Sequence, residues 1–259
     1  MAQTLNLGTD GNWAVKKDSL LAYNSENGNF KPLPFDFTRA SSATVVNKDG
    51  LIETVGSGKA RIDFKDDAKG ALLLEPTRSN LITYSEDFSQ WTSAVITELP
   101  SSEISPNGSL SAYNLNGTIA YSSSFVSSIS INSGSNYTFS FWVKNATDDG
   151  KLGVRLVAGS NDVRYIFNIN NKTSTPFINY ISGFVSSNIE EYSNGWYRCS
   201  LTVLSNGTTA TAGLYPKYID KVEENSIDVF GAQLEQGSYA TSYIPTQGSA
   251  VTRVADVCN

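Results

Sequence analysis

Strict alternation of apolar and polar residues over long runs restricts what this chain can fold into. The run NYTFSFWVKN sends Tyr137, Phe139, Phe141 and Val143 to one side and the residues between them to the other. Successive side chains of a β-strand point to opposite faces of a sheet, so such a run has one face for a core and one for the surface. Similar runs are LGVRLVAG, VRYIFNIN, GWYRCSLTVL, ATAGLYP and SIDVFGAQLE. Eight to ten such strands, separated by Gly, Asn and Ser turns, predict an antiparallel jelly-roll sandwich of two sheets.

The first part of the chain follows a different pattern, because its strands are short and evenly spaced. Ala43–Val46 and Leu51–Val55 flank the turn sequence Lys48-Asp49-Gly50, where glycine suits a positive φ. Strands of this size bury little surface by themselves, so we expect this region to pack on the next domain or on copies of itself. The fold class is therefore all-β, with residues 1–78 as a β-hairpin region, 79–245 as the sandwich and 246–259 as an extended tail.

Composition narrows the classes of function. The chain has no histidine, which removes the Ser-His-Asp triad and most transition-metal sites. Its net charge of −6 argues against a nucleic-acid-binding surface, because phosphate contacts need a basic patch. Met1–Leu7 has neither the basic nor the apolar part of a secretion signal, and no apolar run approaches the ~20 residues that span a bilayer. We expect a protein made in a cytoplasm, with no nucleic-acid or membrane partner.

The acidic residues do not suggest an active site. A glycosidase needs two carboxylates held at a fixed separation across a cleft. Here acids such as Asp66-Asp67 and Asp148-Asp149 are adjacent in turn sequences, where they are usually solvated. Cys199 and Cys258 are too few for a disulfide framework, and Cys199 is expected to be a small buried hydrophobe. The sequence therefore predicts a protein that is not an enzyme.

Four stretches carry a resemblance to a known family. They are DFTRASSATVVNKDGLIE, ALLLEPTRSNLITYSEDFSQWT, NGWYRCSLTV and FGAQLEQGSYATSYIPTQGSAVTRVADV, and together they cover roughly Phe35 to Val257. This combination resembles structural proteins of tailed bacteriophages, of the head fibre, head spike and tail fibre types, with a carbohydrate-binding-module-like sandwich. The resemblance implies a homotrimeric surface protein of a virion, made in the bacterial host cytoplasm. It also implies that residues 1–40 attach the chain to a capsid or tail protein.

The same resemblance leaves three functions open. In the first, the sandwich binds host-surface glycans and serves adhesion. In the second, it is purely structural and makes trimer and capsid or tail contacts without binding sugar. In the third, it is an accessory sugar-binding subunit that works beside a tail depolymerase.

Candidate sugar-binding residues lie in the outward rows of the long strands. Glycan binding needs aromatic faces to stack on sugar rings and fixed polar groups to bond the hydroxyls. Trp142 is the leading candidate, because its sequence neighbours occupy the core row. Arg155, Tyr215 and Gln233 are expected to share its face. The alternative for Trp142 is a position under a loop or at a subunit contact, since aromatic residues are also enriched at protein interfaces.

A structural calcium ion is a second candidate site. Sandwiches of the type that this chain resembles often carry one ion, held by carboxylates and backbone carbonyls. Glu86, Asp87 and Asp228 are the candidate ligands, from the exit of the first strand and from the last strand. The alternative is that Glu86 and Asp87 belong to the cap of a short turn within YSEDFSQW. Apart from this ion we expect no cofactor.

The closing segment QGSAVTRVADVCN resembles a connector that leads into another domain in related phage proteins. We expect it to fold back onto the N-terminal strands or onto a neighbouring subunit. Trp91 and Trp196, which lie beside turn residues, are expected to be buried at the ends of the core.

Overall fold

The computed structural model describes residues 3–5, 13–16, 19–24, 28–32, 36–147, 149–217 and 225–259. The chain divides into two compact units. The sandwich unit comprises residues 79–240 and 245–251, and the N-terminal unit comprises residues 1–78, 241–244 and 252–259. The chain passes between the units four times: at β10 (Arg78–Asn80), before and after residues 241–244, and at β23 (Val251–Arg253). Residues 252–259 thus belong to the N-terminal unit rather than forming a separate tail.

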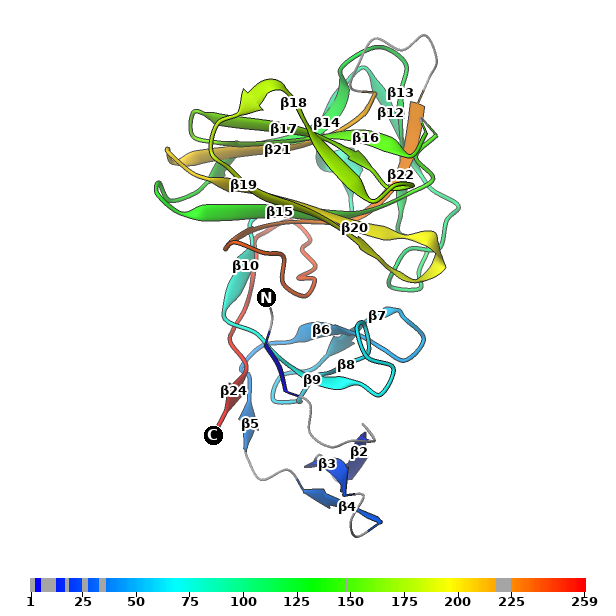
Figure 1. Cartoon of the computed structure of the whole chain (residues 1–259), viewed down its shortest axis with the longest axis vertical. Helices are drawn as coiled ribbons and strands as arrows, with labels where there is room; N and C mark the ends of the chain where they lie inside the picture. The colour runs from blue at the N-terminus through cyan, green and yellow to red at the C-terminus, as the bar shows by residue number, and fades with distance from the viewer. Residues whose placement is uncertain are drawn as a thin grey trace. The chain divides into compact units, whose positions relative to one another are not determined.

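Two six-stranded antiparallel sheets form the sandwich unit within the described residues, and Figure 1 shows them as two layers. The first sheet has the order β11 (Thr92–Ala94), β14 (Ser122–Ser130), β21 (Thr209–Lys217), β16 (Lys151–Ala158), β17 (Asn161–Asn168) and β18 (Thr173–Ile181). The second sheet has the order β12 (Ile96–Pro100), β13 (Tyr113–Gly117), β22 (Asn225–Gln236), β15 (Asn136–Lys144), β20 (Tyr197–Leu204) and β19 (Phe184–Glu191). The predicted all-β antiparallel sandwich is confirmed.

The core lies between these sheets and is made by the alternating residues that the sequence marks. Phe139 and Phe141 of β15 join Leu156 of β16 and Leu214 of β21 in one cluster of fully buried side chains. Burial of each such side chain contributes about 1.5–3 kcal/mol. Cys199 belongs to this cluster, and burial raises the pKa of its thiol far above the ordinary value. It is the buried hydrophobe that the sequence predicts.

The predicted number of eight to ten strands is too low. The strands that sequence alternation does not reveal are rich in Ser and Thr, and they include β14 (SSSFVSSIS), β18 (TSTPFINYI) and β19 (FVSSNIEE). β18 and β19 are edge strands. Most residues of β19 are exposed to solvent, so this strand does not need a row of apolar side chains. In β14, Ser122 and Ser124 are buried, so serines occupy positions at which the alternation predicts hydrophobic residues.

Helical structure among the described residues is limited to two 3₁₀ turns, η1 (Phe88–Gln90) and η2 (Ser193–Gly195), and none of it is long and apolar enough to cross a membrane. Phe88 and Trp91 are buried in the core. Trp196 is also buried, and its indole Nε1 donates to the Ile104 carbonyl at 2.8 Å. Both tryptophans therefore occupy the buried positions that the sequence predicts.

The N-terminal unit is a set of small antiparallel sheets. They are β1 (Gln3–Leu5) with β9 (Ala71–Leu74) and β8 (Ile62–Asp63), β2 (Trp13–Lys16) with β3 (Ser19–Asn24) and β4 (Asn29–Pro32), β6 (Ala43–Val46) with β7 (Ile52–Val55), and β5 (Phe37–Thr38) with β24 (Val257–Cys258). The β6–β7 hairpin has the predicted turn, in which Gly50 has a φ of 76°.

A buried ion network of Arg39, Arg61, Glu75, Arg253 and Asp256 holds this unit together. Arg39 Nη1 donates to Asp256 at 3.0 Å, and Arg61 Nη1 donates to Glu75 at 2.8 Å. Arg253 Nη1 lies 2.7 Å from Glu75, and Arg61 also pairs with Asp256. All five side chains are at most 1% exposed. Burial alone would raise the pKa of Glu75, but Arg253 and Arg61 outweigh it and hold that pKa below its ordinary value.

This network joins distant parts of the sequence. Arg253 and Asp256 come from the closing segment, whereas the other three residues precede the sandwich. Directly after Asp256, Val257 and Cys258 form β24, which pairs with β5 (Figure 1). The prediction that the closing segment folds back onto the N-terminal strands is confirmed.

Candidate functional site

A groove lies on the first sheet and opens on the face directed away from the core. Its lining residues come from the chain before β14 and from β16, β17, β18 and β21, and it holds about 290 Å³, part of it open to solvent. They are Tyr121, Gly153, Val154, Arg164, Tyr165, Ile166, Phe177 and Tyr215. Aromatic rings, one guanidinium and a glycine are thus gathered on one sheet face.

A glycine makes room for the groove. Gly153 of β16 lies between its partners Ile166 on β17 and Tyr215 on β21, and it has no side chain to fill the space between them. Gly213 of β21 is buried on the same face but lies outside the groove lining, and an added Cβ there would lie 3.1 Å from the Cβ of Phe125. The floor of the groove is therefore open because the residue at position 153 has no side chain.

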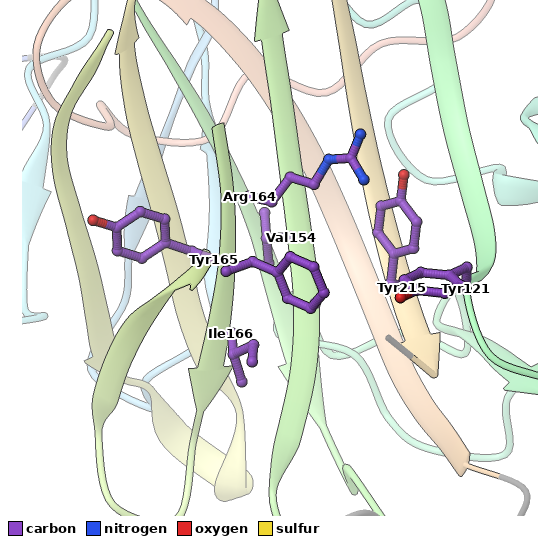
Figure 2. A pocket seen from close by; sticks show the side chains of 8 residues that line it. Tyr121, Val154, Arg164, Tyr165, Ile166 and Tyr215 are labelled. Atoms are coloured by element: carbon purple, nitrogen blue, oxygen red, sulfur yellow. The ribbon is translucent and has the colours of Figure 1, made fainter. Parts of the chain in front are cut away.

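Tyrosine rings form one wall of the groove. Tyr121 is 52% exposed, and its φ of 63° lies in the left-handed region that non-glycine residues rarely adopt. Figure 2 shows the rings of Tyr121 and Tyr215 on the same side as the extended Arg164 side chain, whereas the Tyr165 ring points the other way. Tyr165 is buried and stacks on Phe184, with ring centroids 4.5 Å apart. The groove therefore presents Tyr121 and Tyr215, but not the ring of Tyr165.

Two arginines share one carboxylate beside the tyrosines. Arg155 donates to both oxygens of Asp162 at 2.9 and 2.8 Å, and Arg164 does so at 3.2 and 2.7 Å. The hydrogen bonds to Asp162 are the main reason why the pKa of Arg155 lies above its ordinary value, and Tyr215 raises it as well. Burial would raise the pKa of Asp162, but the hydrogen bonds from the two arginines lower it below its ordinary value. Asp162 thus stays ionised at neutral pH and fixes both guanidinium groups.

The predicted sugar-binding residues fall on two different sheets. Arg155 and Tyr215 lie on the groove face of the first sheet, where Tyr215 is the cross-strand partner of Gly153 and Arg155 follows Gly153 by two residues on β16. Trp142 and Gln233 belong to β15 and β22 of the second sheet, so the four residues do not share a face. The prediction of one common face is therefore wrong.

The prediction that Trp142 faces solvent is also wrong, since its residue exposure is only 1%. Its ring meets Tyr192 and Phe230 edge to face, with centroids 5.5 and 5.9 Å apart, and the Arg198 guanidinium lies 4.4 Å above it. Gln233 is 0% exposed, and its amide donates to Glu235 at 2.6 Å. β15 and β22 are inner strands of a sheet that is covered on both faces at these positions, so their outward rows are not available to a ligand.

The predicted calcium ligands do not come together. Among the described residues, no group of three His, Cys, Asp or Glu side chains is placed to hold a metal ion. Asp87 caps η1, accepting from the Ser89 backbone at 3.2 Å, and also accepts from Tyr113 Oη at 2.8 Å. Asp228 accepts from Asn114 at 3.0 Å and from Asn145 at 2.8 Å. Glu86 is half-buried beside the cap. The capping alternative holds for Asp87.

Sequence reasoning missed Arg164 and Tyr121. A signal for Arg164 exists, because the short turn between β16 and β17 places it directly across from Arg155. Tyr121 precedes β14 in a loop, where no periodic pattern marks it.

Comparisons with known proteins give only distant similarities. No protein-family model and no curated protein matches the chain. The enzymatically active domain of tailspike protein 4 of bacteriophage CBA120 is 14% identical, with a TM-score of 0.35, over 61% of this chain and 21% of that one. The tandem CBM22-1–CBM22-2 domain of Paenibacillus barcinonensis Xyn10C is 13% identical, with a TM-score of 0.39, over 79% of this chain and 75% of that one. A structure of carbohydrate-binding modules from the β-sandwich superfamily is 11% identical, with a TM-score of 0.37, over 84% of this chain and 86% of that one. The chain thus spans about a fifth of the tailspike domain, and the solved structures to which it is similar include a phage tailspike domain and carbohydrate-binding β-sandwiches.

Proposed function

We propose that the sandwich unit binds a glycan in the groove of its first sheet and is not an enzyme. The observation that carries this proposal is the pairing of the Tyr121 and Tyr215 rings with a glycine floor at Gly153. Aromatic rings stack on the apolar faces of pyranose rings, and the Arg155–Asp162–Arg164 network offers fixed groups for sugar hydroxyls. The groove is partly open to solvent, which suits a chain of sugars lying along the sheet.

The setting that we propose for this binding is the surface of a phage virion. The four sequence stretches that resemble virion proteins support a head fibre, spike or decoration subunit, made in the bacterial host cytoplasm and attached through residues 1–40 to a capsid or tail protein. Weak binding at each groove would then be multiplied by the number of copies on the particle, so that modest single-site affinity suffices for adhesion.

Removing the Tyr121 ring tests the proposed groove without a cost in folding. Glycine prefers the left-handed backbone that Tyr121 adopts, so Tyr121→Gly is expected to keep the thermal midpoint of unfolding at or above that of the wild type. Loss of one stacking ring should weaken glycan binding about tenfold. A glycan array made from host-surface polysaccharides, followed by calorimetry with the best ligand, measures both chains.

A matched control is Phe30→Ala, which removes an aromatic ring of 44% exposure from the N-terminal unit. A second variant, Gly153→Val, fills the floor of the groove without changing a ring or a charge. If no polysaccharide binds the wild type, or if both groove variants bind as the wild type does, the groove is not a glycan site and the purely structural function stands. Binding that appears only when a depolymerase subunit is present would favour the accessory function.

The homotrimer is a second proposal with its own measurement. Light scattering on the purified chain at micromolar concentration is expected to give three times the mass of a single chain. A monodisperse monomer would contradict the trimer and would leave the groove proposal in place.

A further inference from the structure

The first sheet is basic although the chain as a whole is acidic. Its six strands contain the basic residues Lys151, Arg155, Arg164 and Lys217 and a single acidic residue, Asp162, which gives a net charge of +3. The entire chain carries −6. The positive charge of this sheet is therefore a local feature and does not follow from composition.

The second sheet has the opposite balance. Its strands hold two basic and five acidic residues, a net charge of −3: Lys144 and Arg198 against Glu98, Glu190, Glu191, Asp228 and Glu235. The two layers of the sandwich thus differ in sign, and the groove lies on the positive layer.

Three of the four basic residues of the first sheet lie on the groove face. Lys151 and Arg155 alternate with core residues along β16 and so share the row of Gly153, and Arg164 lies across from Arg155 on β17. A bulge between Leu214 and Lys217 turns Lys217 toward the second sheet, where its Cβ faces Gly117 of β13. Lys217 is buried and donates to the Thr118 carbonyl at 3.0 Å, and Lys151 lies 3.9 Å from the exposed carboxylate of Asp149. Lys151 therefore contributes to the field of the face rather than to the groove itself, and Lys217 makes its hydrogen bond within the fold.

Arg164 is the basic residue that lines the groove and can reach a ligand there. Its Nε and Nη2 are used by Asp162, and its guanidinium carbon lies 3.8 Å from the centroid of the Tyr180 ring. Within the described residues its Nη1 donates to no protein group. The side chain is thus held in place on two sides with one donor nitrogen left for a ligand, beside the rings of Tyr121 and Tyr215 (Figure 2).

We propose that the glycan bound in this groove is an acidic polysaccharide, with its carboxylate or phosphate on Arg164 Nη1 and its sugar ring on the tyrosines. This inference rests on the proposed glycan-binding function and names its ligand class. Charge-assisted hydrogen bonds from a guanidinium to an anion are about twice as strong as neutral ones, and Asp162 neutralises only one of the two arginines. A neutral glycan would leave the remaining positive charge of the pair uncompensated.

The test compares acidic polymers with their neutralised forms. The probes are polygalacturonate, alginate and hyaluronate, each alongside its carboxyl-reduced derivative, together with a phosphodiester-linked teichoic acid. The protein variants are Arg164→Gln and, as a control of equal charge change on the second sheet, Lys144→Gln, whose partner is Glu103 at 2.7 Å. Dissociation constants are measured at low and at high salt, because added salt screens exposed charges.

We expect at least one acidic polymer to bind about tenfold more tightly than its reduced form. Arg164→Gln should remove this preference, and Lys144→Gln should keep it. Binding to the uronates or to the teichoic acid tells whether the acid is a carboxylate or a phosphate. Equal binding of the acidic and reduced polymers overturns this inference and leaves the glycan-binding groove intact. An equal loss in Arg164→Gln and Lys144→Gln overturns it as well, since the effect would then be one of total charge. Failure of every polymer, neutral and acidic, to bind overturns the proposed function itself.

Discussion

Replacement of Asp256 by alanine is expected to destabilise the N-terminal unit by about 3–5 kcal/mol. The side chain is fully buried and accepts from both Arg39 and Arg61. Without it, two guanidinium groups remain in the interior with fewer counter-charges, and a buried charge without its partner is among the costliest defects in a folded protein. Hydrogen exchange measured by mass spectrometry should show loss of protection in peptides covering residues 43–75. Peptides covering residues 137–143 of the sandwich should change much less.

Two further variants show whether the charge of the network matters. Asp256→Asn keeps the shape and some hydrogen-bonding capacity, so its loss of stability should be intermediate. Asp66→Ala removes an exposed carboxylate from the same unit and should change stability by less than about 0.5 kcal/mol. Wild-type protection of residues 43–75 in Asp256→Ala would mean that the network contributes little to this unit.

Replacement of Trp142 by alanine is expected to destabilise the sandwich unit by about 3–5 kcal/mol. The substitution leaves a cavity among Tyr192, Arg198 and Phe230, and it removes the ring on which the Arg198 guanidinium rests. Urea denaturation followed by far-UV circular dichroism measures the loss, since the signal from strands does not depend on the deleted indole.

Glycan binding by the folded fraction of Trp142→Ala should equal that of the wild type, because Trp142 does not line the groove. Trp142→Phe should recover part of the lost stability, and Leu110→Ala, at a site of 70% exposure, should lose almost none. A stable Trp142→Ala chain that fails to bind glycan would contradict the placement of the binding site in the groove and would indicate that Trp142 contacts the glycan.

The candidate site was partly readable from the sequence. Alternation along LGVRLVAG and ATAGLYP places Arg155 and Tyr215 outside the core row, and the structure has both on the groove face. The same argument applied to NYTFSFWVKN and SIDVFGAQLE selects Trp142 and Gln233, which are buried. Apart from a bulge in SIDVFGAQLE, which shifts its core row between Val229 and Ala232, the pattern is regular in all four strands. What differs is whether other segments cover the outward face, and a period of two carries no information about that.

The buried ion network of the N-terminal unit could not be predicted from local sequence either. Arg39, Glu75, Arg253 and Asp256 lie in three stretches of the sequence, and the sandwich strands separate the first two of these stretches from the third. Nothing local to those stretches shows that the four side chains meet, because up to 217 positions separate paired residues. The contact requires the closing segment to lie against the N-terminal strands, where β24 pairs with β5.

The sequence by itself determined the class of fold, most of the long strands and the side of those strands that faces the core, because these follow from residue type and a period of two along a single strand. The tertiary structure decided which outward faces are exposed, where the glycine gap and the tyrosine rings of the groove coincide, and which sheet is positive. Those properties depend on strand order and on loops that bring distant residues together, such as Tyr121 beside Tyr215, and no local pattern encodes them.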